Sequence, residues 1–187
     1  MRIRTILAAA AVPAALAASL LGATAASAAT GPIKVTDQQV ADSLMAQGYI
    51  GNSIDVPAGA DVQLRWVDVH GQVTVEGKLS LASSQIEGNA TVSGPGAGLS
   101  LFNGPSHFWR DVTVNGAGGF YDGSWLNSSL KTSSDGQQID GSLTFTNNTG
   151  SRMSLNGSMT VNGKFTYSGN ALPYAGGLTV SGKQVIS

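Results

Sequence analysis

The chain has 187 residues, of which 42% are hydrophobic and only 11% are charged, and its formal net charge is −1. The ten basic residues are scattered, so no basic face is available for nucleic acid or an anionic membrane. The absence of cysteine excludes disulfides and thiol chemistry, so the fold depends on its hydrophobic core.

The first 28 residues have the three parts of a secretory signal peptide. Arg2 and Arg4 supply positive charge, residues 6–21 are apolar, and Ala26-Ser27-Ala28 is an A-x-A cleavage site. The apolar run has no stop-transfer flank, so a membrane-spanning helix is the weaker alternative. We therefore expect residues 1–28 to be removed and the mature protein to be secreted, extracellular or cell-wall associated, and free of the membrane.

A short helix is predicted at about 37–47, within an N-terminal segment that covers residues 29–60. The sequence Thr36-Asp37-Gln38-Gln39 fits a capping box, in which the Thr36 hydroxyl would accept from the backbone of the last residue. Apolar residues follow at helical spacing, and Gly48 is suited to the C-terminal stop. No later segment is convincingly helical, so residues 61–187 are expected to be all-β.

From Val67 onward, apolar residues and glycines alternate with polar residues, as in strands with one buried face. The alternation recurs as a unit of apolar, x, Gly, x, apolar, Thr, apolar, x, Gly. Units start at residues 69, 86, 108, 139, 155 and 174, and a degenerate copy starts at Tyr121. Such spacing is typical of a solenoid whose turns bury their faces by stacking. We therefore predict a single-domain parallel β-helix over 61–187, with a β-sandwich as the alternative.

Six threonines fall at the same place in the unit, which a β-sandwich would not explain. In a β-helix they would form an outward ladder of hydroxyl and methyl groups on one flat face. The predicted members are Thr74, Thr91, Thr113, Thr144, Thr160 and Thr179. Ice-binding arrays use Thr-x-Thr in each turn, and only residues 144–146 have that pattern among these units, so ice binding is not expected.

The glycine–apolar spacing of about residues 61–182 resembles that of bacterial β-solenoids. It is similar to the short-coil repeat of bactofilins, the polymer-forming cytoskeletal β-helices. The resemblance implies a tightly wound coil and carries over no functional residue. Bactofilins are cytoplasmic, whereas this chain begins with a predicted signal peptide, which argues against simple membership of that family.

The spacing of reactive residues reveals no catalytic or metal-binding constellation. The two histidines, His70 and His107, belong to different repeats, and the glycine-rich calcium-binding nonapeptide is absent. We interpret Asp55, Asp61 and Asp68 as scattered surface acids. The chain also lacks a Gly-x-Ser-x-Gly elbow. We therefore expect no catalytic residues, no metal ligands and no cofactor.

Two aromatic segments, residues 107–111 and 120–125, form the candidate ligand-binding site. Aromatic rings on a flat β-face can stack on sugar rings, while acidic and basic side chains can bind hydroxyls. About one coil apart, the two segments would form a single patch of Trp109, Arg110, Asp111, Tyr121, Asp122 and Trp125. The alternative is that Phe108 and Trp125 face the core and that Arg110, which replaces a repeat glycine, marks a bulge. Trp66 is expected to close the core.

These features predict a non-enzymatic structural or adhesive module at the cell surface or in the extracellular matrix. Open coil ends would allow a homo-oligomer to form end to end, with the helix at 37–47 capping one end. The alternative is a carbohydrate-binding module, or a small polysaccharide-active enzyme, that uses Trp109, Tyr121 and Trp125. The expected partner is a polysaccharide or cell-wall ligand, and no nucleic-acid partner is expected.

Overall fold

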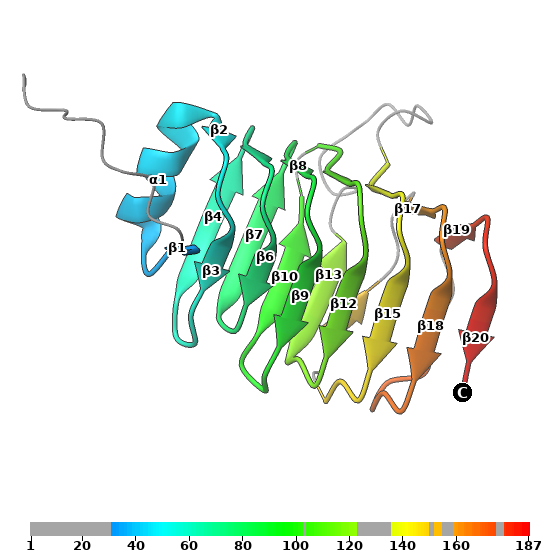
Figure 1. The fold of residues 1–187 in the computed structure, drawn as a ribbon. Helices are drawn as coiled ribbons and strands as arrows, with labels where there is room; N and C mark the ends of the chain where they lie inside the picture. The colour runs from blue at the N-terminus through cyan, green and yellow to red at the C-terminus, as the bar shows by residue number, and fades with distance from the viewer. Residues whose placement is uncertain (1–30, 103, 123–135, 150–151, 155–158, 175–177) are drawn as a thin grey trace, which may run out of the picture. The chain divides into compact units, whose positions relative to one another are not determined.

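The compact unit Gly31–Ser187 is a parallel β-solenoid of about six turns, as the computed structural model shows (Figure 1). The structure describes residues 31–102, 104–122, 136–149, 152–154, 159–174 and 178–187, with the backbone alone at 121–122 and 152–154. The predicted signal peptide lies outside the described residues and stays a prediction.

Successive turns add strands to three parallel sheets, which we name A, B and C. Sheet A contains β1 (Ile33–Lys34), β3 (Ile54–Val56), β6 (Val73–Val75), β9 (Ala90–Ser93), β12 (Val112–Asn115), β15 (Leu143–Thr146), β18 (Phe165–Ser168) and β20 (Gln184–Ile186). Sheet B contains β2 (Tyr49–Ile50), β5 (Asp68–Val69), β8 (Gln85–Ile86), β11 (His107–Phe108), β14 (Gln138–Ile139), β17 (Met159–Val161) and β19 (Leu178–Val180). Sheet C contains β4 (Asp61–Arg65), β7 (Lys78–Ala82), β10 (Gly98–Leu101), β13 (Gly119–Asp122) and β16 (Arg152–Ser154).

Every strand pairing within the described residues is parallel, so the β-helix prediction is confirmed and the antiparallel sandwich is excluded. Successive sheet A strands are aligned through Ile54, Val73, Ala90, Val112, Leu143, Phe165 and Gln184. The longest step runs from Val112 to Leu143 and includes residues 123–135, which lie outside the described residues.

The threonine ladder lies on sheet A, but two of its predicted members were wrong. The pairings align Thr74, Thr91, Thr113, Thr144 and Thr166 in adjacent strands. Thr160 and Thr179 pair with each other in sheet B instead. The predicted units starting at 155 and 174 are therefore out of register with the earlier ones. Tyr121 does not start a turn either, because it pairs with Ser100 in sheet C.

The two glycines of the unit lie at two different corners of each turn, and each corner has its own reason to need glycine. At the corner from sheet B to sheet A, a Cβ on Gly141 would lie 2.6 Å from the backbone nitrogen of Asp111 in the preceding turn. At the corner that follows each sheet A strand, Gly94, Gly116 and Gly169 have φ between 62° and 104°, in the left-handed region. Asn147 takes the same corner position with φ 55°, which asparagine tolerates better than most residues.

At the corners, buried polar side chains form hydrogen bonds to backbone groups of the neighbouring turn. The Asn148 side chain accepts from the Ala117 N–H at 2.8 Å and donates to the Val114 carbonyl at 3.0 Å. The Ser106 N–H donates to Gln137 Oε1 at 2.8 Å in the corner from sheet C to sheet B. These contacts satisfy backbone groups that the irregular corners would otherwise leave unpaired.

The core lies between the three sheets and becomes more aromatic toward the C-terminal turns. Its largest fully buried side chains include Phe108, Phe120, Phe145 and Phe165. The expectation that Phe108 is a core residue is thus confirmed. Trp66 was predicted to close the core, but it is 74% exposed and lies at a corner with φ 53°, so that prediction was wrong.

Helix α1 (Gln38–Gln47) lies against sheet C at the N-terminal end of the solenoid (Figure 1). Its Gln38 amide donates to the Gln63 carbonyl at 3.0 Å and accepts from the Gln63 N–H at 2.8 Å. Gln63 belongs to β4, the edge strand of sheet C. The helix therefore satisfies backbone groups that an open sheet edge would expose to another chain.

The helix bounds match the prediction, but the cap lies one residue later. Asp37, rather than Thr36, is the N-cap, and its Oδ1 accepts from the Val40 N–H at 3.1 Å. The Thr36 hydroxyl donates to Asp37 Oδ2 at 3.0 Å. Gly48 ends the helix with φ 71°.

We expect Asp37→Ala to lower the thermal midpoint at neutral pH, because it removes the helix cap. The Val40 N–H, the Thr36 hydroxyl and the Gln39 N–H hold the pKa of the Asp37 carboxyl below its usual value. Its contribution is therefore present above the unfolded pKa of about 3.9 and lost as the pH falls through the lower folded value. Thermal unfolding of both proteins across this range should show their difference shrinking in acid. A difference that is constant with pH would contradict this role.

Candidate ligand-binding face

The outward surface of sheet B gathers both histidines and two of the exposed aromatic rings. Buried Ile50, Val69, Ile86, Phe108 and Ile139 alternate with outward residues on each side. The residues before them form one column, Tyr49, Asp68, Gln85, His107 and Gln138. The residues after Val69, Ile86, Phe108, Ile139 and Val161 form a second column, His70, Glu87, Trp109, Asp140 and Asn162. We call these two columns the sheet B face.

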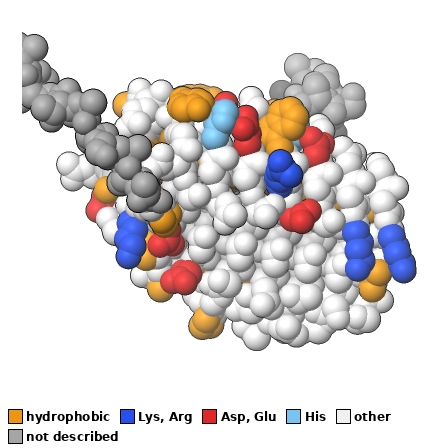
Figure 2. Space-filling view, in the orientation of Figure 1, with side chains coloured by type: hydrophobic (Ala, Val, Ile, Leu, Met, Phe, Trp, Pro, Cys, Tyr) orange, Lys and Arg blue, Asp and Glu red, His pale blue; other side chains and the backbone are white. Residues whose placement is uncertain are grey.

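Figure 2 shows where the charged, histidine and hydrophobic side chains lie on one face of the molecule. Histidine, acidic, basic and hydrophobic side chains gather along the upper edge of the molecule, near β2 and β8 in Figure 1. The broad face below them, over β9, β12 and β15, is mostly white. Uncharged polar side chains therefore cover these middle strands of sheet A, and the groups capable of specific recognition lie mainly on sheet B.

Trp109 is the centre of the first cluster on this face. The side chain is 49% exposed, and its ring stacks on His107 with centroids 4.3 Å apart and an interplanar angle of 28°. His107 Nε2 lies 2.8 Å from Asp140 Oδ2 on the next turn. The indole is thus oriented by a histidine that a carboxylate holds in place.

The Asp140 carboxylate is held by three side chains. Gln138 and Asn162 donate to its Oδ1 at 2.7 and 2.8 Å, and His107 contacts its Oδ2. The hydrogen bond from Gln138, followed by those from His107 and Asn162, holds the pKa of Asp140 below its usual value despite some opposing burial. Asp140 is therefore a fixed, ionised acceptor beside the Trp109 ring.

A second cluster forms around His70. The Tyr49 ring, 57% exposed, lies 4.6 Å from the His70 ring. His70 Nδ1 is 2.9 Å from Glu87 Oε2, and its Nε2 is 3.6 Å from Asp68 Oδ2. Asp68 was interpreted as a scattered surface acid, but it belongs to a group of three interacting titratable side chains.

The predicted segment at 107–111 crosses a corner of the solenoid. Trp109 lies on the sheet B face, and Arg110 is exposed at the turn toward sheet A. Asp111 Oδ1 accepts from the Ser142 N–H at 2.7 Å, so this carboxylate stabilises the start of the next sheet A strand. Trp109 is therefore the member of the segment that the geometry favours for ligand contact.

The second predicted segment belongs to the same turn but to a different sheet. Tyr121 and Asp122 lie in β13 of sheet C, paired with Ser100 and Leu101. Trp125 lies outside the described residues. The structure therefore does not bring the described parts of the two segments onto one sheet, and a role for Tyr121, Asp122 or Trp125 in binding stays a prediction.

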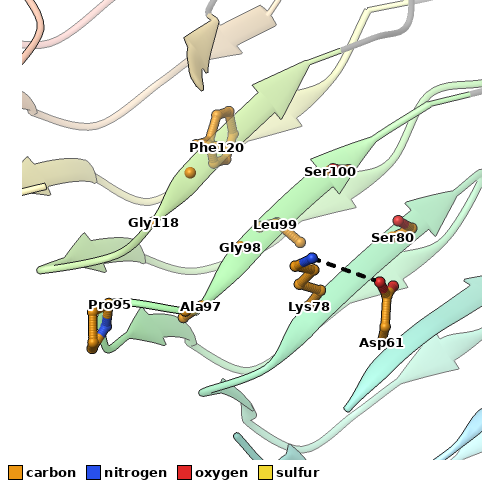
Figure 3. Close-up of a pocket in the computed structure, with 12 residues that line it drawn as sticks. Asp61, Lys78, Ser80, Pro95, Ala97, Gly98, Leu99, Ser100, Gly118 and Phe120 are labelled. Carbon is orange, nitrogen blue, oxygen red and sulfur yellow. Dashed lines mark ion pairs between the residues drawn. The ribbon is translucent and has the colours of Figure 1, made fainter. Parts of the chain in front are cut away.

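The outer face of sheet C contains a hollow of about 510 Å³ (Figure 3). Gly98 and Gly119 occupy outward positions there, and their lack of side chains leaves the space. Its charged groups are Lys78 and Asp61, whose Nζ and Oδ2 atoms are 3.9 Å apart and whose side chains are both largely exposed. The hollow is lined largely by backbone and small residues, so it has fewer side chains that could recognise a ligand than the sheet B face has.

Sequence reasoning missed Tyr49, Asp68, Glu87 and Asp140 as members of a site. The step of 17 residues from Val69 to Ile86 places Glu87 beside His70, so aligning the units would have revealed that pair. The pair of His107 and Asp140 spans the longest step, whose length the repeat pattern did not give.

No described helix is both long and apolar enough to cross a membrane. Comparison of the chain with protein-family models, with curated proteins and with solved structures found no match.

Proposed function

We propose that this chain is a secreted, non-catalytic adhesive module that binds a polysaccharide of the cell surface or matrix through the Trp109 cluster. The cluster consists of Trp109, His107, Asp140, Gln138 and Asn162. The observation that carries the proposal is an indole that remains half exposed while the structure fixes its orientation. A large ring held in this way on a flat sheet suits the apolar face of a sugar ring.

Polar groups around the indole suit the hydroxyls of a sugar. Asp140 follows Trp109 in its column, one strand away. A carboxylate has about four lone-pair positions, and three donors already contact Asp140, which leaves capacity on Oδ2 for a ligand hydroxyl. Because this acceptor is fixed in advance, binding would lose less conformational entropy than with a mobile side chain.

The position of α1 favours a discrete module and argues against a filament that grows by adding chains at this end. The coil spacing resembles that of the polymer-forming bactofilins. Here Gln38 occupies the backbone groups of the edge strand β4 at Gln63. A second chain would have to displace this contact to extend sheet C at that end.

We expect Trp109→Ala to weaken polysaccharide binding by at least ~10-fold, as the loss of a central aromatic anchor does at other interfaces. Co-sedimentation with peptidoglycan, cellulose, chitin and pectin, beside a sample without polymer, measures binding and identifies the ligand class. The thermal midpoint should change little, because half of the indole surface is already in water.

Trp66→Ala is the matched control, since Trp66 is even more exposed but lies at the corner between sheets C and B, before β5. It should keep full binding. Equal losses in the two variants would indicate non-specific adsorption and reject the Trp109 cluster as the site. Pelleting without polymer would support self-association in place of polysaccharide binding.

A further inference from the structure

We propose that Asp68, His70 and Glu87 form a binding site for a divalent transition-metal ion of the zinc class. This inference is independent of the polysaccharide proposal, because it concerns a different cluster on the sheet B face. Asp68 and His70 flank buried Val69 on one turn, and Glu87 follows buried Ile86 on the next. Two stacked turns thus supply one imidazole and two carboxylates.

The three side chains lie close enough together to reach a single metal ion. One ligand atom from each of Asp68, His70 and Glu87 can be chosen so that all three lie within 4.8 Å of one another. Zinc bonds of about 2.0–2.2 Å in a tetrahedral site place ligand atoms roughly 3.3 Å apart. His70 contacts the two carboxylates through different ring nitrogens, with Nδ1 2.9 Å from Glu87 and Nε2 3.6 Å from Asp68, so side-chain rotation must bring both carboxylates to one nitrogen.

The charge of the cluster is unbalanced. Asp68 Oδ1 is buried and has no hydrogen-bond partner, the only such side-chain atom found in the described residues. No ion pair of Asp68 or Glu87 with a lysine or arginine occurs in that part of the chain, and His70 alone contacts both carboxylates. A dication bound through both oxygens of Asp68 would pair with Oδ1 and neutralise the two carboxylates.

The ligand set favours zinc and its neighbours over calcium or magnesium. Imidazole suits zinc, copper and nickel, whereas calcium takes six to eight oxygen ligands. The three side chains are each about 35–40% exposed, so solvent can supply a fourth ligand. The Tyr49 ring lies beside His70, with ring centroids 4.6 Å apart.

The other histidine provides an internal comparison. His107 also contacts a carboxylate, Asp140, but there the amides of Gln138 and Asn162 donate to the same carboxylate. No second acid completes that cluster, and the structure gives no other group of three metal-ligating side chains among the described residues. The chain thus contains two pairs of histidine and carboxylate, of which one has the composition of a metal site.

Isothermal titration of the purified protein with ZnCl₂, and in parallel with CaCl₂, tests the proposal. We expect one Zn²⁺ per chain and much weaker Ca²⁺ binding. Replacing the ligand in His70→Ala or Glu87→Gln should each weaken Zn²⁺ binding by more than ~10-fold, since even an outer-shell partner of a metal ligand contributes that much. Zn²⁺ should also raise the thermal midpoint of the parent protein but not that of these variants.

His107→Ala is the matched control, and it should retain one Zn²⁺ with unchanged affinity. Glu87→Gln preserves side-chain shape, so it remains informative if His70→Ala does not fold. Absence of Zn²⁺ binding, unchanged binding in Glu87→Gln, or Ca²⁺ binding as tight as that of Zn²⁺ would each overturn the assignment.

Discussion

Gly88→Ala is expected to destabilise the solenoid by about 3 kcal/mol or more, the upper end of the cost of overpacking. Gly88 lies at the corner from sheet B to sheet A, directly over Gly71 of the preceding turn. A Cβ there would contact the Gly71 carbonyl oxygen and would lie 2.5 Å from its carbon and 2.8 Å from the Gln72 nitrogen. These are backbone atoms, so no side-chain rotation relieves the contact, and the two turns must separate.

Gly96→Ala is the control for this substitution. A Cβ at Gly96 would meet no atom within 4 Å, and its φ lies outside the left-handed region. The change should be neutral or slightly stabilising, because alanine restricts the unfolded chain. Urea unfolding followed by circular dichroism compares the two. A Gly88→Ala midpoint within error of Gly96→Ala would show that the turns are looser than this geometry indicates.

The solenoid was predictable because its rules are local. Alternation along Val73–Val75 places every second side chain in the core, and it requires no knowledge of distant residues. Asn147 could be recognised as a substitute for the last glycine of the unit, and its φ of 55° explains why. The α1 bounds were equally local, since Gly48 stops the helix in the left-handed conformation.

The register of the later turns was not predictable, because the sequence contains two overlapping fits to the same unit. Residues 155–163 match it, and so do residues 161–169. The structure uses the second, in which Gly163 stacks on Gly141 and Phe165 pairs with Leu143. Only the packing of one turn on another chooses between the two, and local pattern contains no information about it.

The candidate site was partly predictable for the same reason. Trp109 could be singled out because an indole is unusual in a repeat of small and polar residues. Asp68, His70 and Glu87 are individually ordinary, and they become a site only when two turns stack in register. Asp140 contacts His107 across the longest turn of the solenoid, and the length of that turn could not be predicted from the spacing of the other units.

Phe145→Ala is expected to cost about 3–5 kcal/mol, as for other buried aromatic residues, out of the 5–15 kcal/mol typical of a domain. Phe145 is fully buried, and its ring contacts Phe120 edge-on at 5.0 Å, Tyr167 at 6.0 Å and Phe165 at 6.4 Å. Its removal therefore leaves a cavity that three turns share.

Each turn of a solenoid is stabilised by its neighbours, so the loss should be local. Amide hydrogens should exchange faster in β15, which contains Phe145, and in its neighbours β12 and β18. Those of β4 and β7, at the other end, should remain protected. Trp109→Ala removes an aromatic side chain of larger size from the surface and should leave protection of all these strands unchanged. Uniform loss of protection in Phe145→Ala would instead mean that the turns unfold as one cooperative unit, in which case Gly88→Ala and Phe145→Ala should expose the same amides.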